Sequence, residues 1–388
     1  MTQKVYLGDI CDIKIGRTPP RRQPQWFNKS HGVRWVSIKD MGNTGKYISQ
    51  TSEFLTAGAI RKFNIPIIPT GTLLMSFKLT VGRLGFTEYD MCSNEAIVQL
   101  PIKDPDMVDK NYLYYYLKNF NFGSLSSTSS IATAVNSKTV KNISVNLPLF
   151  DQQKKIASIL GSLDEKIELN RRMNETLEQL GQALFRHYFV DNSEVNSWES
   201  GEVSDMVRIY SGFAFKSKDF DIDGRYGLVT IKNVQDGSFI KDCTDHLSEP
   251  LPDKTPEHVH LKSGDIILSL TGNVGRVCAV VGRDYLLNQR VAKLASDESQ
   301  AYVYFLFRSK TMRDRMIGIS KGTAQKNLSP IETGKLKIKI PPTNTMSQFE
   351  ENAIELLNMI VSNNKQIQTF TSLRDSLLPK LISGEIEV

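Results

Sequence analysis

The chain has 388 residues and a formal net charge of +6, and hydrophobic residues make up 40% and charged residues 23% of the sequence. This length is enough for two or three domains, and the composition is typical of folded globular proteins rather than disordered ones. The sequence shows no long apolar run, no secretory signal and no CxxC pair among its four cysteines, so we expect a cytoplasmic protein without a membrane span, a disulfide scaffold or a zinc ribbon.

The first part of the chain has the pattern of a mixed α+β domain. Short apolar or alternating runs predict strands, namely GVRWVSIKDM at 32–41, GTLLMSF at 71–77 and EAIVQL at 95–100. The segment NYLYYYLKNF at 111–120 predicts a helix with an aromatic packing face. We therefore expect a first globular domain over residues 1–148.

A different pattern follows Pro148. From Ile156 to Tyr188, steps of four and then three residues meet mostly large apolar side chains. A period of 3.5 residues over more than four heptads indicates a coiled coil, so we predict a long helix over residues 149–191. Its seam includes Ile156, Leu160, Leu163, Ile167, Asn170, Leu177 and Leu184.

The remainder of the chain repeats the first part. LVTIKNV at 228–234 matches WVSIKDM at 35–41, and Gly264 of GDIILSL matches Gly71 of GTLLMSF at an offset of 193 residues. Two copies are too few for a solenoid, so we expect a duplicated domain. The second copy comprises a globular domain over 192–341 and a second long helix over 342–388. The seam of this helix includes Phe349, Leu356, Ile360, Asn363, Phe370 and Leu377.

The two helices are expected to pack on each other, because a lone helix of this length is marginal and both carry the same register. Asn170 and Asn363 occupy equivalent seam positions. A buried asparagine at a seam fixes register and partner at a cost in stability, and a solvated layer where the helices splay is the alternative. Pro379 predicts an early end or a kink in the second helix.

The glycine-punctuated stretch SLTGNVGRV at 269–277 lacks the GxxxxGK[ST] pattern of a P-loop, because Arg276 and not lysine follows its second glycine. The first copy, SFKLTVGRL at 76–84, keeps the Gly-Arg pair but has Leu79 in place of Gly272. Both copies therefore predict a β-hairpin with a basic tip. Three roles stay open for the loop: a structural turn, a surface facing a ligand or DNA, and a catalytic loop.

No enzyme site can be built from the remaining motifs. GxGxxG, GxSxG and HExxH are absent, and neither Pro-Pro pair has the neighbours of a methyltransferase tetrapeptide. His258 and His260 would share one face of a strand, but no third ligand has a suitable spacing. We therefore predict no catalytic residue, no metal and no cofactor bound by this chain.

Basic residues gather in turn-like segments that recur in both copies. The segments at 16–34 and 211–220 correspond to each other, as do those at 133–142 and 320–329. Lys and Arg suit phosphates and guanine edges, and Gln and Asn suit adenine edges, although a plain solvated loop is the alternative for any one of them. The candidate DNA-binding residues are Arg17, Arg21, Arg22, Lys39, Lys78, Arg83, Lys138, Lys216, Lys232, Thr271, Asn273, Arg276, Lys321, Gln325, Lys326 and Asn327.

Over essentially its whole length the sequence resembles the specificity (S) subunit of type I restriction-modification systems. The resemblance rests on the openings LGDICDIKIGRTP at 7–19 and VSDMVRIYSGFAF at 203–215, and most specifically on NLPLFDQQKKIASILGSLDEKIELNRRMNETLEQLGQALFRHYF at 146–189. The second helix departs from this pattern, because it lacks the Leu-Asp pair and has Asn358 and Met359 in that region.

The resemblance implies an α+β fold with two target recognition domains, an antiparallel coiled coil and an approximate internal twofold axis. Each domain would read one half of an asymmetric bipartite site in double-stranded DNA, and the coiled coil would set the spacer. The implied partners are two methyltransferase subunits, which carry S-adenosylmethionine and methylate adenine, and restriction subunits, which cut DNA. The competing hypotheses are a duplicated scaffold for proteins or RNA and an unrecognised enzyme acting at the TGNVGR loop.

Overall fold

The computed structural model describes residues 2–42, 45–125, 136–322 and 326–388. The chain forms two compact units, the first made of Met1–Glu168 with Phe370–Val388 and the second of Leu169–Thr369. The boundary between the units falls within the two long helices, so each unit contains one globular domain and a part of both helices. None of the helices in the described ranges has the length and apolarity that a membrane crossing requires.

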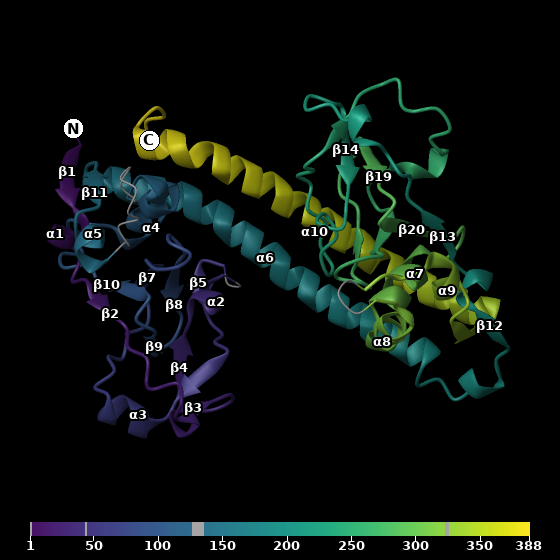
Figure 1. Cartoon of the computed structure of the whole chain (residues 1–388), viewed down its shortest axis with the longest axis horizontal. Helices are drawn as coiled ribbons and strands as arrows, with labels where there is room; N and C mark the ends of the chain where they lie inside the picture. The colour runs from purple at the N-terminus through teal and green to yellow at the C-terminus, as the bar shows by residue number, and fades with distance from the viewer. Residues whose placement is uncertain (1, 43–44, 126–135, 323–325) are drawn as a thin grey trace. The chain divides into compact units, whose positions relative to one another are not determined.

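The globular part of the first unit is built on two sheets and a two-stranded ribbon (Figure 1). Its strands are β1 (Gln3–Tyr6), β2 (Lys14–Ile15), β3 (Phe27–Asn28), β4 (Val33–Val36), β5 (Tyr47–Ile48), β6 (Glu53–Leu55), β7 (Leu73–Ser76), β8 (Leu84–Thr87), β9 (Met91–Ser93), β10 (Ile97–Leu100) and β11 (Ser144–Leu147). The strand orders are β2-β10-β7-β8-β5 and β3-β6-β4-β9, and β1 pairs with β11. The pairs β4–β9 and β5–β8 are parallel, and the other pairs are antiparallel.

The second unit repeats this plan. Its strands are β12 (Ser200–Glu202), β13 (Arg208–Ser211), β14 (Tyr226–Val229), β15 (His246–Leu247), β16 (His260–Leu261), β17 (Ile266–Ser269), β18 (Val277–Ala279), β19 (Tyr285–Leu287), β20 (Val291–Ala295) and β21 (Lys337–Lys339). The orders β13-β20-β17-β18 and β15-β14-β19-β16, with the ribbon β12–β21, follow those of the first unit except at the sheet edges, where β5 and β3 have no equivalent and β16 is added beside β19. The parallel pair β14–β19 corresponds to β4–β9. The predicted α+β class and internal duplication are confirmed.

Short helices cover the sheets. They are α1 (Leu7–Ile10), α2 (Ile38–Met41), α3 (Ala57–Lys62), α4 (Lys110–Asn119) and α5 (Ser137–Lys141) in the first unit, and α7 (Gln300–Arg308), α8 (Lys310–Ile319) and α9 (Pro330–Gly334) in the second. Tyr112, Leu113 and Tyr115 of α4 are buried, as their aromatic pattern predicts. The region at 301–316 has the pattern of one helical segment but forms two helices, because Ser309 ends α7 and its side chain caps α8 at the Met312 amide.

Single turns of 3-10 helix complete both domains. In the first unit they are η1 (Pro24–Trp26) and η2 (Phe122–Leu125). In the second unit they are η3 (Val195–Ser197), η4 (Val203–Asp205), η5 (Ser217–Asp219) and η6 (Glu257–Val259). His258 therefore lies in η6 and precedes the strand that begins at His260, so the two imidazoles do not share one strand face as expected.

The long helices are α6 (Phe150–Phe189) and α10 (Thr343–Ser383). Every position of the predicted seam register is buried or half-buried. In the first unit Leu160 of α6 joins a core with Leu378 and Leu381 of α10. In the second unit the later part of α6, including Leu177, joins a core with the earlier part of α10, including Phe349. The helices therefore run antiparallel, as predicted for a coiled coil.

Of the two outcomes expected at Pro379, an early end or a kink, the early end of α10 is wrong. The helix continues through Pro379 to Ser383. Proline removes one backbone donor and crowds the carbonyl four residues earlier, which weakens a helix. Leu378 and Leu381 are 6% and 3% exposed in the core of the first unit, and this burial on either side of the proline holds the last turn in place.

A buried ion pair joins the two helices in the first unit. Arg374 donates from Nη1 to Asp164 Oδ1 over 2.6 Å, and Tyr115 donates to Asp164 Oδ2 over 2.7 Å. Burial alone would raise the pKa of Asp164, but the charge of Lys118 and the hydrogen bonds from Arg374 and Tyr115 hold that pKa below its usual value. The carboxylate thus stays charged and fixes α4 and both long helices together.

A layer of asparagines crosses the seam in the second unit. Asn170 and Asn363 are each 6% exposed. Asn363 donates to Asn174 Oδ1 over 2.9 Å, Asn174 donates to Asn364 Oδ1 over 3.0 Å, and Asn170 donates to Gln366 Oε1 over 3.2 Å. These burials favour the buried, register-fixing arrangement over a solvated layer.

Candidate nucleic-acid interface

Both copies contain the same β-hairpin, formed by β7–β8 in the first unit and β17–β18 in the second. At its base Ser76 accepts from the Gly82 amide through its carbonyl and donates from Oγ to the Thr80 carbonyl over 2.5 Å. Ser269 makes the same two contacts with Gly275 and Asn273. Gly82 and Gly275 have φ angles of +89° and +80°, a conformation that glycine adopts without strain. The predicted hairpin is therefore present twice with the same backbone hydrogen bonds.

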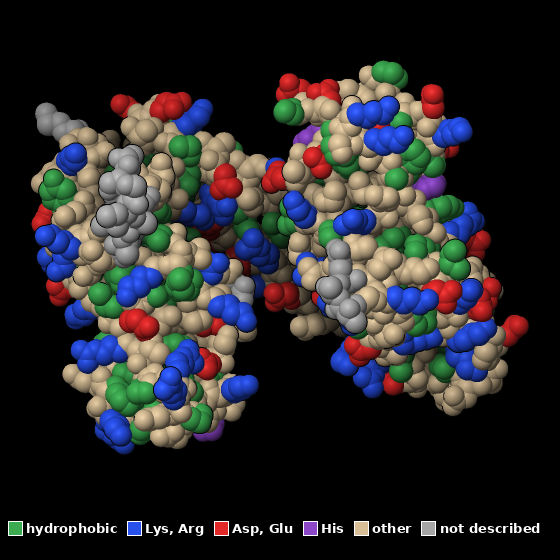
Figure 2. Space-filling view, viewed as in Figure 1, with side chains coloured by type: hydrophobic (Ala, Val, Ile, Leu, Met, Phe, Trp, Pro, Cys, Tyr) green, Lys and Arg blue, Asp and Glu red, His purple; other side chains and the backbone are tan. Residues whose placement is uncertain are grey.

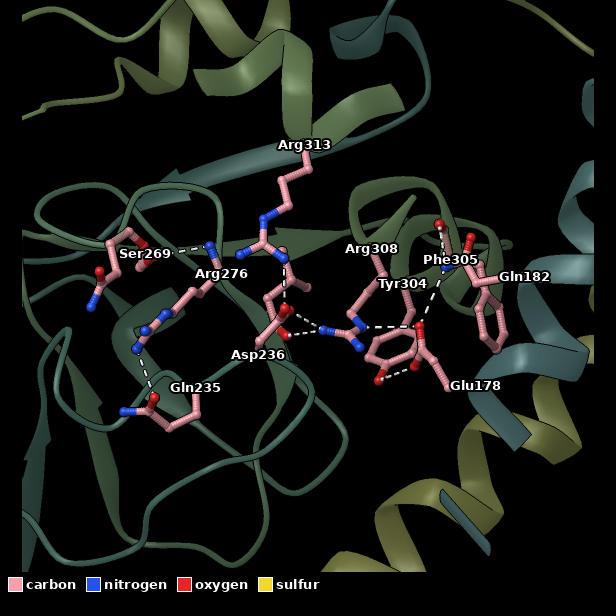
Figure 3. Close-up of polar contacts among 12 residues, drawn as sticks. Glu178, Gln182, Gln235, Asp236, Ser269, Arg276, Tyr304, Phe305, Arg308 and Arg313 are labelled. Atoms are coloured by element: carbon pink, nitrogen blue, oxygen red, sulfur yellow. Dashed lines mark hydrogen bonds and ion pairs between the residues drawn. The ribbon is translucent and has the colours of Figure 1, made fainter. Parts of the chain in front are cut away.

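The arginines of the two hairpins do not form a basic tip. Arg83 turns back and donates from Nη1 to the Ile38 carbonyl over 2.6 Å. Arg276 donates from Nη1 to Gln235 Oε1 over 2.6 Å, as Figure 3 shows. Both guanidiniums are half-buried. Arg83 attaches its hairpin to the first residue of α2, and Arg276 attaches its hairpin to the loop that contains Gln235, so at least one donor of each arginine is used within its own domain. The side chains at the tips belong to residues 78–80 and 271–273.

The loop held by Arg276 is itself anchored to the long helix α6. Asp236, next to Gln235, forms ion pairs with Arg308 and Arg313, and Arg308 donates from Nε to Glu178 of α6 over 3.0 Å (Figure 3). Tyr304 also donates to Glu178 over 3.0 Å. Burial, and then the neighbouring Glu178 charge, hold the pKa of Tyr304 well above its usual value, so the phenol stays a donor. The network fixes the hairpin loop relative to α6 within the second unit.

An open groove of about 560 Å³ lies beside the second hairpin. The Leu270 carbonyl accepts from the Leu328 amide over 2.7 Å, and the Lys326 carbonyl accepts from the Gly272 amide over 3.3 Å, so the hairpin and the segment after 325 form one edge. The polar residues that line the groove are Ser211, Thr271, Gln289, Arg290, Lys326, Asn327 and Ser329. The structure thereby brings three predicted residues, Thr271, Lys326 and Asn327, into one site.

Two groove residues, Gln289 and Arg290, were missed by the sequence reasoning. Both side chains are exposed, and Arg290 forms no ion pair with any residue in the described part of the chain. Thr271 Oγ1 is buried and has no hydrogen-bond partner among the described residues. A comparison of the two copies could have identified them. Gln289 and Arg290 precede β20, whereas Glu95 and Ala96 precede the equivalent strand β10, so the two copies differ in charge at this position.

The predicted basic segment of the first domain is partly engaged. Arg17 donates to the carbonyls of Phe63 and Asn64 over 3.2 and 3.0 Å. Arg21 pairs with both carboxylate oxygens of Glu53 over 3.0 and 2.7 Å, and its guanidinium stacks over two aromatic rings. Arg22 is exposed. Within this segment Arg22 is therefore the predicted arginine that is free to meet a ligand.

The predicted lysines lie on the surface. All are exposed and none forms an ion pair with another described residue; they are Lys39, Lys78, Lys138, Lys216, Lys232, Lys321 and Lys326. Lys138 lies in α5 and not in a turn, because Asn136 caps that helix. Gln325 lies outside the described residues. Figure 2 shows Lys and Arg side chains dispersed over the visible face of each globular domain rather than joined in one strip.

The described residues show neither a metal-binding cluster nor an activated thiol. They contain no group of three or more His, Cys, Asp or Glu side chains placed to hold a metal ion. Burial raises the pKa of the Cys11, Cys92 and Cys278 thiols to about 12 and that of Cys243 to about 11, so these thiols are protonated at neutral pH. A protonated, buried thiol is a poor nucleophile.

Comparisons with known proteins agree on one family. The family model described as type I restriction modification DNA specificity domain matches residues 2–179 and 196–365. The MjaIX specificity subunit of a type I restriction enzyme from Methanocaldococcus jannaschii is 26% identical, and the match covers 98% of this chain and 93% of that protein. The HindI specificity subunit from Haemophilus influenzae is also 26% identical over 64% of this chain and 70% of its own length. Among solved structures, the S subunit of a type I restriction-modification system from M. genitalium has the same fold, with a TM-score of 0.60 at 16% identity over 98% of this chain and 96% of that one.

Proposed function

The chain belongs to the type I restriction-modification DNA specificity family, as a non-catalytic specificity subunit, and we propose that each of its two globular domains reads one half of a split DNA site. The observation that carries this proposal is the β-hairpin that occurs in both domains, as β7–β8 and as β17–β18. Each hairpin presents exposed polar or cationic side chains next to a backbone that Arg83 or Arg276 holds in place. Rigid presentation suits the reading of base edges, because less conformational freedom is lost on binding.

The groove of the second domain has the chemistry of a base-reading site. Arginine pairs with guanine O6 and N7, and glutamine or asparagine pairs with adenine N6 and N7, in the major groove. Arg290, Gln289 and Asn327 supply these groups side by side, and Lys326 supplies a charge for a phosphate. We therefore propose that this groove reads guanine and adenine edges in one of the two half-sites.

The recognised DNA site should be asymmetric. Glu95 and Ala96 stand in the first domain where Gln289 and Arg290 stand in the second. A carboxylate accepts from cytosine N4 and repels phosphates. Arginine donates to guanine O6 and N7 and attracts phosphates. Two domains with the same fold and opposite charge at this edge would not read the same bases.

The long helices would set the spacer between the half-sites. A helix of 40 residues, the length of α6, is about 60 Å long at 1.5 Å per residue. Half-sites that face the same side of B-DNA lie about 34 Å apart or multiples of this distance. The helix is therefore long enough for the spacer role.

The outer face of α6 offers a docking site for the methyltransferase subunits. Leu169, Met173 and Leu180 are 51%, 37% and 48% exposed, and spacings of four and seven residues place them on one face of the helix. Large apolar side chains exposed together mark protein interfaces. In the proposed complex two methyltransferase subunits carry S-adenosylmethionine, restriction subunits join them, and this chain binds no cofactor.

Methylome sequencing tests the proposal. Cells that express this chain with its partner subunits should carry methylated adenine in one asymmetric bipartite motif. Exchange of residues 1–148 for those of another such subunit should change one half of the motif and leave the other half intact. The absence of any motif in the presence of a competent methyltransferase would refute DNA recognition, and a change in both halves would refute one domain per half-site.

A further inference from the structure

The tip of the first hairpin carries an exposed leucine on a strained backbone. Leu79 has a φ angle of +61° and is 94% exposed. Its counterpart in the second hairpin is Gly272, with a φ angle of +70°. The two loops therefore share one backbone conformation, which glycine occupies freely and leucine does not.

Stability of the domain does not explain this leucine. The other described non-glycine residues with positive φ are Asn64, Lys254 and Asp284, of which Asn and Asp tolerate the left-handed region. Leu79 has a branched apolar side chain that gains almost no burial to offset the strain. Residues held in a strained backbone conformation tend to occur at functional sites. Leu79 combines this strain with a position at the tip of a hairpin and an apolar side chain that nothing in the domain covers, so we interpret it as a contact made outside the chain.

The surroundings of Leu79 fit DNA as that contact. Lys78, next to it, is exposed and cationic, and Lys39 is exposed in α2, the helix to which Arg83 holds the hairpin. The Ser76–Thr80 hydrogen bond of 2.5 Å closes the turn and fixes the direction of the tip. A two-stranded antiparallel ribbon fits the major groove, where the C5-methyl group of thymine is the apolar feature of a base edge.

We infer that Leu79 reads a thymine in the first half-site by contact with its C5-methyl group. The inference rests on the proposed function and adds a specificity-determining residue to the first domain. The second domain has Gly272 at the equivalent position and so has no side chain there to contact a methyl group. In that domain the polar groove would read the bases instead. Only the first half-site should therefore depend on an apolar contact at the hairpin tip.

The test compares the wild type with Leu79→Gly, which installs the residue of the second hairpin at the same backbone conformation. The melting temperature of Leu79→Gly should equal or exceed that of the wild type, because the strain is removed. Each assembled methyltransferase complex is titrated with a duplex that carries the mapped site, and with duplexes in which uracil replaces single thymines of the first half-site. Lys78→Ala serves as a control and should weaken binding to all duplexes alike, as loss of a phosphate contact does.

Wild-type affinity should fall about three- to fivefold at one uracil, the factor that burial of one methyl group supplies. Leu79→Gly should lose a similar factor on the thymine duplex and be insensitive to that uracil. Equal binding by both proteins, a wild type indifferent to every uracil, or failure of Leu79→Gly to assemble with the methyltransferase would overturn the inference. Absence of specific binding by the wild type would instead overturn the proposed function.

Discussion

Gly181 of α6 tests how closely the second domain packs on the long helix. A Cβ atom at this position would lie 2.1 Å from Cε1 and Cζ of Phe305, whose ring is fully buried, so the ring or the helix would have to move. Overpacking costs about 1–3 kcal/mol, and the enclosed ring favours the upper end. Alanine recovers about 1 kcal/mol in helix propensity. Gly181→Ala should therefore destabilise the protein by about 2 kcal/mol.

Gly161 of the same helix provides the matched control. It is also buried, but an added Cβ would meet only Tyr115 Oη at 4.0 Å. Gly161→Ala should stabilise the protein by about 1 kcal/mol through propensity alone. Thermal unfolding followed by circular dichroism should show a melting temperature about 4–8 °C lower for Gly181→Ala and about 2–4 °C higher for Gly161→Ala. A melting temperature for Gly181→Ala at or above the wild-type value would refute the close packing of α7 on α6.

Three further changes, one of them with a control substitution, probe the groove and the helix pair. Arg290→Ala should cost about 1–3 kcal/mol of DNA binding and relax the methylation motif at one position, whereas Lys216→Ala should weaken binding without changing the motif; an unchanged motif with Arg290→Ala would contradict base reading. The pKa of Asp164 is lowered on folding, so its stabilisation is present above the ordinary aspartate value of 3.8 and disappears as pH falls below it. Asp164→Asn should flatten the acid side of a plot of melting temperature against pH, and an unaltered slope would count against the ion pair. Asn363→Ala removes the donor to Asn174 and should lower stability to urea by about 1–3 kcal/mol, with a loss under about 0.3 kcal/mol indicating a solvated seam.

The repeat and the seam of this protein could be predicted from sequence because both are periodic. The offset between Gly71 and Gly264 aligns the two hairpins, which the structure then shows with the same backbone hydrogen bonds. The heptad positions of α6 and α10 are buried or half-buried because helix pairing repeats every 3.5 residues whatever the rest of the chain does.

The direction of single side chains could not be predicted in the same way. Arg276 follows a turn glycine, which suggests an exposed tip, but Gln235 lies within reach because the Gly237 amide donates to the Val277 carbonyl and so holds this loop beside β18. Arg290 belongs to no local motif and becomes a candidate only beside Lys326, which is distant in the sequence. Pro379 follows a local rule for helix ends that burial of its neighbours overrides.

The first unit is built from two segments that are far apart in the sequence, and this has a consequence for synthesis on the ribosome. Its core includes Leu378 and Leu381, which are made long after Glu168, the last residue of its N-terminal segment. At about 5–20 residues per second, the segment from Leu169 to Thr369 takes on the order of 10–40 s to emerge. The domain translated first is therefore completed last, and its apolar face on α6 stays open to water or a chaperone while the second domain folds.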